Sequence, residues 1–191
     1  MARKPLRAVP TLILAGSGDA GPEHWCSWLA AELATAGRTV RLPSLSRPAQ
    51  LAGWTAQLRG ALRELPDVGF DVVAHSLACL LWLHHASAAS GLPRPGRVAL
   101  VGLPDAEHAD APSFFPVPLD ADAVRRAAEG TVLIGSDNDP RCPRGAAAVY
   151  GTPLKIATTV TAGAGHFEPA SGYGAWPAML AWCNRENLAF F

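Results

Sequence analysis

Short apolar runs rich in β-branched and aliphatic residues alternate along this chain with longer stretches of helical periodicity. This alternation predicts a parallel sheet with both faces covered, because parallel strands are joined by crossover helices. We predict strands at 11–15, 39–42, 70–74, 97–102, 131–135 and 154–160. We predict helices between Pro22 and Gly37, between Pro48 and Pro66, and near 77–90, 120–129, 143–150 and 175–189. Gly91, Gly130 and Gly151 are predicted to end the helices near 77–90, 120–129 and 143–150.

The order of these segments predicts an α/β fold. We expect a three-layer α/β/α sandwich with a six-stranded parallel sheet in the order 2-1-3-4-5-6. At 191 residues the chain suits one domain spanning 1–191, with residues 1–9 as a disordered N-terminal extension. The segment 103–119 contains four prolines and no helical period, so we expect a short loop over one sheet edge and no large lid.

Charge and targeting signals exclude several classes of partner. The 16 basic and 16 acidic residues cancel, which disfavours nucleic acid and acidic membranes as partners. The basic N-terminus is not followed by a secretory apolar segment, and we expect a cytoplasmic protein. The four cysteines have no metal-ligand spacing, so we expect reduced thiols and no metal. No protein partner is indicated.

Ser76 lies in the sequence Ala74-His75-Ser76-Leu77-Ala78, directly between a predicted strand and a predicted helix. A serine on such a tight turn has an exposed hydroxyl, and small residues two before and two after it let the helix pass close to the strands. Both small positions are alanine, a pattern that also occurs by chance in alanine-rich chains. On its own, the motif does not separate a nucleophile elbow from a buried strand-to-helix junction.

Two further residues follow later predicted strands and are candidates for the base that activates Ser76 and the acid that orients this base. Asp139 comes just after the fifth predicted strand and His166 just after the sixth. Ser, then Asp, then His is the chain order of the α/β-hydrolases, with each residue at the carboxyl edge of the sheet. Asp137 competes with Asp139 as the acid that orients the histidine. We favour Asp139, because Pro140 directs its backbone toward an extended conformation and stiffens the loop.

The predicted strand order places the loop after the first strand beside this serine. Sites form where strand order reverses, here between the first and third strands. The backbone N–H groups of the Gly16–Gly18 loop, including Ser17 and Gly18, are therefore candidates for an oxyanion hole together with that of Leu77.

At these positions the chain resembles the small serine hydrolases similar to retinoblastoma-binding protein nine and bacterial YdeN, within the α/β-hydrolase superfamily. The resemblance is carried by residues 21–25, 73–79, 137–140, 165–167 and 171–177. It places the family triad on Ser76, Asp139 and His166, and Ala78 departs from the more usual glycine. It implies hydrolysis of small esters or amides through an acyl-enzyme, without cofactor or metal.

Several other residues are candidates for the substrate pocket, namely His24, Trp25, His75, Phe114 and Phe167. His24 and Trp25 begin the helix after the oxyanion loop, although a tryptophan at helical spacing is more often part of the core. His75 adjoins the serine, where local packing or hydrogen bonding is the alternative. Phe114 and Phe167 form an apolar wall in this interpretation, whereas exposed aromatics in a proline-rich loop equally suit a protein contact.

Two other functions remain open from the sequence. Gly16, Gly18 and Gly21 match a dinucleotide-binding pattern, but the region that should supply an acidic residue contains Arg41, which suits NADP. The second alternative is a binding protein on a hydrolase scaffold with an idle triad, because fold does not determine function.

Overall fold

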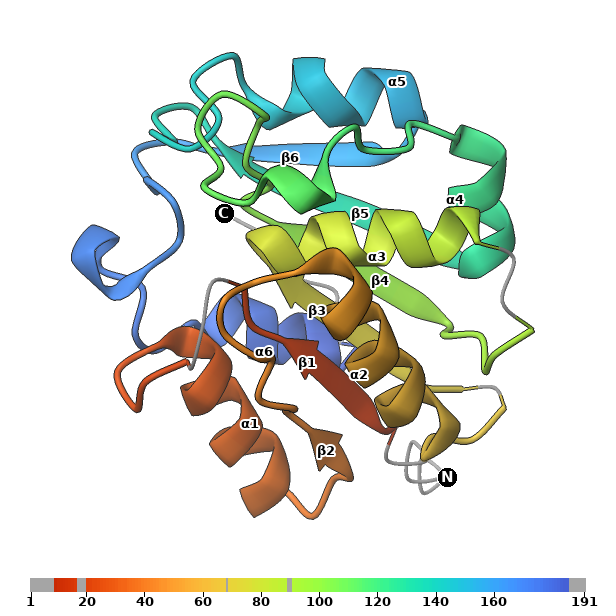
Figure 1. Cartoon of the computed structure of the whole chain (residues 1–191). Coiled ribbons are helices and arrows are strands. Elements are labelled where there is room, and N and C mark those ends of the chain that lie inside the picture. Colours follow the sequence, from red (N-terminus) through yellow and green to blue (C-terminus); the bar gives the residue numbers. More distant parts are fainter. Residues whose placement is uncertain (1–8, 17–19, 68, 89–90, 186–191) are drawn as a thin grey trace.

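The computed structural model describes residues 9–16, 20–67, 69–88 and 91–185. Its strands are β1 (Thr11–Leu14), β2 (Val40–Arg41), β3 (Asp71–His75), β4 (Arg97–Val101), β5 (Gly130–Ser136) and β6 (Ala157–Thr161). All neighbouring strands are parallel, in the order β2-β1-β3-β4-β5-β6 (Figure 1). The predicted fold class and strand order are confirmed.

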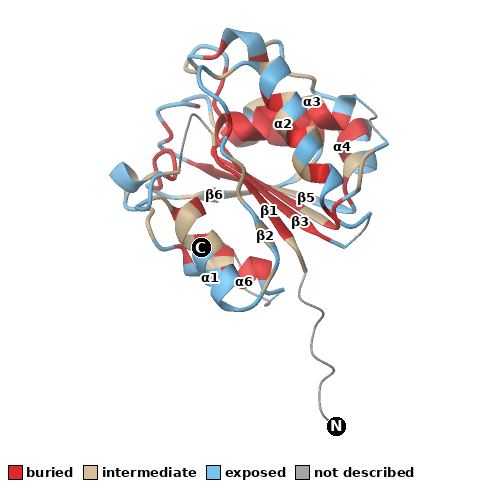
Figure 2. Ribbon diagram, turned by 60° about the horizontal axis from the view of Figure 1, so that its bottom comes forward, coloured by how far each residue is buried: buried red, intermediate tan, exposed pale blue. Residues whose placement is uncertain are grey.

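Helices cover both faces of the sheet (Figure 2). One face carries α2 (Leu51–Arg63), α3 (Leu77–Ser87), α4 (Ala121–Ala127), the π-helical turn η2 (Ala147–Gly151) and α5 (Thr152–Leu154). The other face carries α1 (Trp25–Thr35) and α6 (Pro177–Cys183). Single 3₁₀ turns occur at η1 (Pro112–Phe114) and η3 (Pro169–Ser171).

The core divides into two clusters because side chains alternate along each strand. In β1, Leu12 and Leu14 pack under α2 and α3, whereas Ile13 packs against α1. Strand β3 is buried along its whole length. It lies centrally in the sheet, so the residue that follows it is held by packing on both sides.

The expected elements differ from the observed ones mainly near β6. The helix expected at 143–150 begins later and continues through Gly151 to Leu154, and β6 begins at Ala157. Gly151 does not end this helix but allows close packing, since a Cβ there would lie 2.3 Å from Thr158 Oγ1. Likewise α4 ends at Ala127, and Gly130 begins β5.

Parts of both chain ends lie outside the described residues. The expected N-terminal extension lies almost wholly outside the described residues. The helix expected at 175–189 is shorter in the structure, where α6 spans Pro177–Cys183 and is capped by Asn184. Within the described part of the chain, none of the helices has the length and apolarity needed to cross a membrane.

Candidate active site

Ser76 occupies a sharp turn between β3 and α3. Its backbone has φ 57° and ψ −129°, a region that residues other than glycine rarely adopt. Its N–H donates to the carbonyl of Val101 in the adjacent strand at 2.9 Å, which ties the strained turn to the sheet. The alanines at 74 and 78 are fully buried around the turn. The structure therefore places Ser76 on the strained strand-to-helix turn that the sequence predicts, with alanine in place of glycine on either side.

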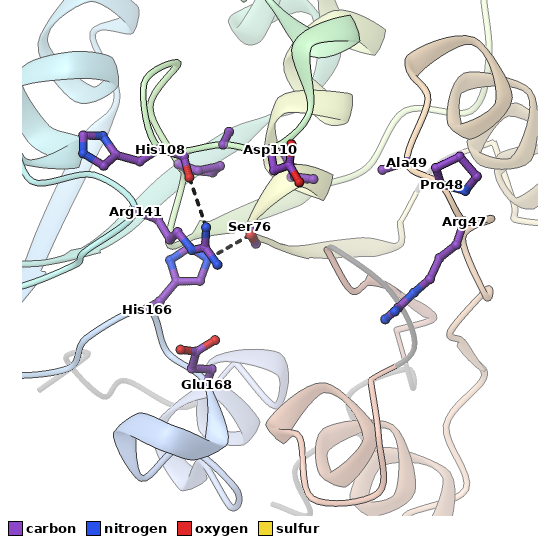
Figure 3. A pocket seen from close by; sticks show the side chains of 12 residues that line it. Arg47, Pro48, Ala49, Ser76, His108, Asp110, Arg141, His166 and Glu168 are labelled. Carbon is purple, nitrogen blue, oxygen red and sulfur yellow. Dashed lines mark hydrogen bonds between the residues drawn. The ribbon is translucent and has the colours of Figure 1, made fainter.

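The structure brings Ser76, Asp139 and His166 together although they are widely separated in the chain. His166 Nε2 lies 2.8 Å from Ser76 Oγ, and His166 Nδ1 lies 3.0 Å from each carboxylate oxygen of Asp139 (Figure 3 shows the first contact). A carboxylate only accepts hydrogen bonds, so Nδ1 carries the proton and Nε2 accepts from the serine hydroxyl. All three residues are buried, with exposed fractions of 4–5%.

Asp137 and Asn138 support the loop that carries His166 rather than the imidazole itself. Asp137 Oδ1 accepts from the N–H of Gly163 and Asn138 Oδ1 from the N–H of Gly165, both at 2.7 Å. Of the two aspartates, Asp139 contacts the His166 imidazole and Asp137 contacts the backbone of its loop.

Trp25 and His75 hold the same loop from the opposite side. His75 Nε2–H donates to the carbonyl oxygen of His166, and Trp25 Nε1–H donates to that of Phe167, both at 2.8 Å. Burial, followed by the nearby imidazoles of His166 and His24, holds the pKa of His75 well below its usual value. His75 is therefore neutral at pH 7.

His24 begins helix α1 as its N-cap. Its Nδ1 accepts from the backbone N–H of Cys26 at 3.1 Å, and its ring lies 5.0 Å from that of His75. Burial lowers the pKa of His24, and the Glu168 carboxylate opposes this effect. A neutral Nδ1 is the form that can cap the helix.

The oxyanion candidates lie at the start of α3 and in the loop after β1. Leu77 is the first residue of α3, so its N–H has no partner within the helix. Gly16 packs directly on the elbow, since a Cβ there would lie 2.8 Å from Leu77 N. Ser17 and Gly18 lie outside the described residues.

A cavity of about 320 Å³ opens beside Ser76 (Figure 3). Its walls come mainly from three loops, and they include two arginines and two acidic residues. The lining residues are Arg47, Pro48, Ala49, Ser76, Leu77, Pro104, His108, Ala109, Asp110, Arg141, His166 and Glu168. The loop expected over one edge of the sheet, 103–119, therefore supplies part of the wall.

The five residues suggested for the substrate pocket are absent from this lining. Trp25, Phe114 and Phe167 are fully buried, and His75 is nearly so. Phe114 packs in the core against the Trp54 ring at 5.3 Å. Phe114 and Phe167 do not form the expected apolar wall of the cavity, because both rings are buried in the core.

The charged wall of the cavity was missed by sequence reasoning. Arg141 Nη1–H donates to the His108 carbonyl at 3.2 Å (Figure 3), and His108 Nδ1–H donates to the buried carboxylate of Asp105 at 2.7 Å. Burial raises the pKa of Asp105, but hydrogen bonds from His108 and Arg144 outweigh it and leave a lowered value. The position of Arg141, two residues after Asp139, was the available signal.

Other kinds of site find little support among the residues that the structure describes. Within those ranges, no group of three or more His, Cys, Asp or Glu side chains is placed to hold a metal ion. Arg41, the NADP candidate, pairs with Glu64 at 3.3 Å. Helix α1 begins four residues after Gly21, so this glycine does not open the helix as the dinucleotide pattern requires.

Comparison with known proteins links this geometry to a family and a fold. A family model described as serine hydrolase matches residues 11–185. The structure is similar to the ydeN gene product of B. subtilis, with 19% identity, coverage of 93% of this chain and 97% of that one, and a TM-score of 0.76. No protein among those with curated descriptions matches the sequence.

Two further solved structures are similar. A putative YdeN-like hydrolase from Pectobacterium atrosepticum has 20% identity, coverage of 93% of this chain and 90% of that one, and a TM-score of 0.65. A structure from work on the metagenome-derived lipolytic enzymes LipS and LipT has 15% identity, 94% coverage of both chains and a TM-score of 0.64. At these identities, the likeness concerns the fold.

Proposed function

Because this chain belongs to the serine hydrolase family, we propose that Ser76, His166 and Asp139 are its nucleophile, its general base and the acid that orients the base. The observation that carries the proposal is the continuous set of contacts from Ser76 Oγ through the imidazole to the Asp139 carboxylate, at 2.8 and 3.0 Å. A serine hydroxyl needs such a base because it is a weak nucleophile at neutral pH.

The proposed reaction runs through an acyl-enzyme. His166 Nε2 takes the Ser76 proton while Oγ forms a bond to the substrate carbonyl carbon, and Asp139 stabilises the resulting imidazolium. The tetrahedral intermediate collapses, the bond to the leaving group breaks, and His166 returns the proton to that group. Water, activated by the same imidazole, then attacks the acyl carbon and releases the acid and free Ser76.

The developing oxyanion would bind the Leu77 N–H and the backbone of the loop that begins at Gly16. Leu77 supports this role because its N–H is free of helix bonding and it lines the cavity. Loss of one such donor typically lowers the rate by about 100-fold or more.

The proposed substrates are small soluble esters or amides. The cavity volume of about 320 Å³ lies at the lower end for ligand pockets, which leaves little room for a long acyl chain. The similar structure from the lipolytic enzyme study supports ester chemistry on this fold. We therefore expect the fastest turnover for short-chain esters.

A fluorophosphonate probe tests the proposal. Wild-type protein should be labelled at pH 7 to 9, whereas Ser76→Ala and His166→Ala should not. Ser113→Ala provides a matched control, since Ser113 lies on an exposed turn outside the cavity lining. Circular dichroism shows whether each variant is folded.

Substrate class and base chemistry have their own measurements. A series of p-nitrophenyl esters and aminoacyl amides of graded length should show a maximum at short chains. The rate should fall on acidification from pH 8 to 5, because a protonated imidazole cannot accept the serine proton. Folded wild-type protein that takes no label would refute the proposal and favour a binding protein on a hydrolase scaffold.

A further inference from the structure

The loop that carries His166 is held at two consecutive carbonyl groups by two buried side chains from other elements. His75, the last residue of β3, bonds the carbonyl of His166, and Trp25, the first residue of α1, bonds the carbonyl of Phe167. The two contacts span 91 and 142 positions of sequence. Neither side chain lines the cavity, so neither touches a substrate there.

The surroundings of His75 leave it one hydrogen-bonding arrangement. The His166 carbonyl only accepts, so His75 carries its proton on Nε2. Its ring lies 5.2 Å from the ring of His166 and 5.6 Å from that of Trp25, and His24 lies on a further side at 5.0 Å. A ring packed this closely has little freedom to turn, so the direction of its N–H is fixed.

The opposite side of the same loop is bonded through its N–H groups. Asp137 and Asn138 accept from Gly163 and Gly165, while Phe167 has a left-handed φ of 52°. A non-glycine residue in that conformation persists only where surrounding contacts hold it. The backbone that carries the imidazole is therefore bonded through its N–H groups to the segment after β5, and through its carbonyl groups to β3 and α1.

We propose that His75 and Trp25 are positioning residues that aim His166 at Ser76 by holding the carbonyl oxygens of residues 166 and 167. This role rests on the proposed function, since it matters for catalysis only if His166 is the base. A shift of the reacting group by about 1 Å can lower a rate by about 100-fold. Loss of either donor should therefore lower turnover while leaving substrate binding nearly unchanged.

The chain offers matched control bonds for both donors. His84 Nε2–H donates to the Phe114 carbonyl and Trp54 Nε1–H to the Ser46 carbonyl, each at 2.8 Å and each on a helix of the opposite face. The test variants are His75→Phe and Trp25→Phe, and the controls are His84→Phe and Trp54→Phe. His75→Gln retains an N–H donor and serves as the conservative rescue.

Turnover is measured per active site, with sites counted by fluorophosphonate titration. A purely structural role would reduce the fraction of titratable protein and the melting temperature but leave kcat per site unchanged. We expect His75→Phe and Trp25→Phe to lower kcat per site by about 10- to 100-fold, with KM changed less than about 3-fold. His75→Gln should recover most of kcat, and both controls should retain it.

A proton NMR measurement tests the positioning independently of catalysis. The low-field signal of a histidine Nδ1–H bonded to a carboxylate should be present in wild type and in His84→Phe, and weakened or lost in His75→Phe. Persistence of that signal in His75→Phe, or wild-type kcat per site in His75→Phe and Trp25→Phe, would overturn the inference. If the wild-type protein is not labelled by the probe, while the NMR signal is present in wild type and lost in His75→Phe, the proposed function alone is refuted.

Discussion

Substitution of Gly16 by alanine should separate the loop after β1 from the elbow at Ser76. The added Cβ would lie 2.5 Å from the carbonyl oxygen of His75, 2.6 Å from Ser76 Cβ and 2.8 Å from Leu77 N. Ordinary van der Waals contacts between heavy atoms begin at about 3.5 Å, so the two segments must move apart by roughly 1 Å. Two of these three atoms belong to the backbone and cannot rotate away.

The displacement acts on both stability and activity. Overpacking of this kind costs about 1–3 kcal/mol of unfolding free energy, which corresponds to a decrease of about 3–10 °C in melting temperature. Movement of the elbow by about 1 Å should lower kcat/KM by about 100-fold or more. Ester hydrolysis and thermal unfolding of Gly16→Ala at pH 8 measure both effects.

Gly60→Ala is the matched control for this substitution. Gly60 lies inside α2 with no atom within 4 Å of an added Cβ, so alanine there should stabilise the protein by about 0.5–1 kcal/mol and leave activity unchanged. A Gly16→Ala enzyme with wild-type kcat/KM would refute the reasoning, because it would show that the elbow does not need close contact with this loop.

Three further predictions concern acids and pH. Asp139→Asn should lower kcat by about 10³–10⁴-fold, whereas Asp137→Asn, which keeps an acceptor for Gly163, should cost less than about 10-fold; equal losses in steady-state assays would contradict the assignment. Asp71→Asn should cost about 2–4 kcal/mol in urea unfolding with kcat per site unchanged, because this fully buried carboxylate bonds Arg97 and Arg185; an unchanged midpoint would show that the cluster is not stabilising. Burial and Arg59 lower the pKa of His85 to about 4, so below pH 6.5 the unfolded chain binds more protons than the folded protein. The free energy of unfolding should therefore fall by about 2 kcal/mol between pH 7 and 5 through this group. In His85→Gln, the free energy of unfolding should decline less steeply over the same range.

Much of the fold was predictable because its signals are local. The strands that became β1, β3 and β4 appear as apolar runs, and their alternation with helices implies a parallel sheet. The resemblance to serine hydrolases is confirmed by the family match over residues 11–185, and the fold is similar to that of the ydeN gene product. The chain order of Ser76, Asp139 and His166 followed from the same pattern.

The misplaced elements and the pocket depended on contacts that the sequence does not display. The sequence predicts a helix end at Gly151, yet the missing side chain of this glycine allows close contact with Thr158 of β6. Arg47, Asp110 and Arg141 belong to loops that are far apart in the sequence and meet around one cavity. From the sequence alone, charged residues of this kind indicate exposed surface, whereas the structure places these three in the wall of the cavity.

The sequence alone determined the alternation of strands and helices and the positions of Ser76, Asp139 and His166 just after strands, because hydrophobic periodicity and position relative to a strand are local properties. Only the tertiary structure decided which aspartate faces His166, which side chains line the cavity, and that His75 and Trp25 bond the histidine loop. Each of these depends on the direction of a side chain after distant segments have packed, and packing direction is not encoded within any short stretch of residues.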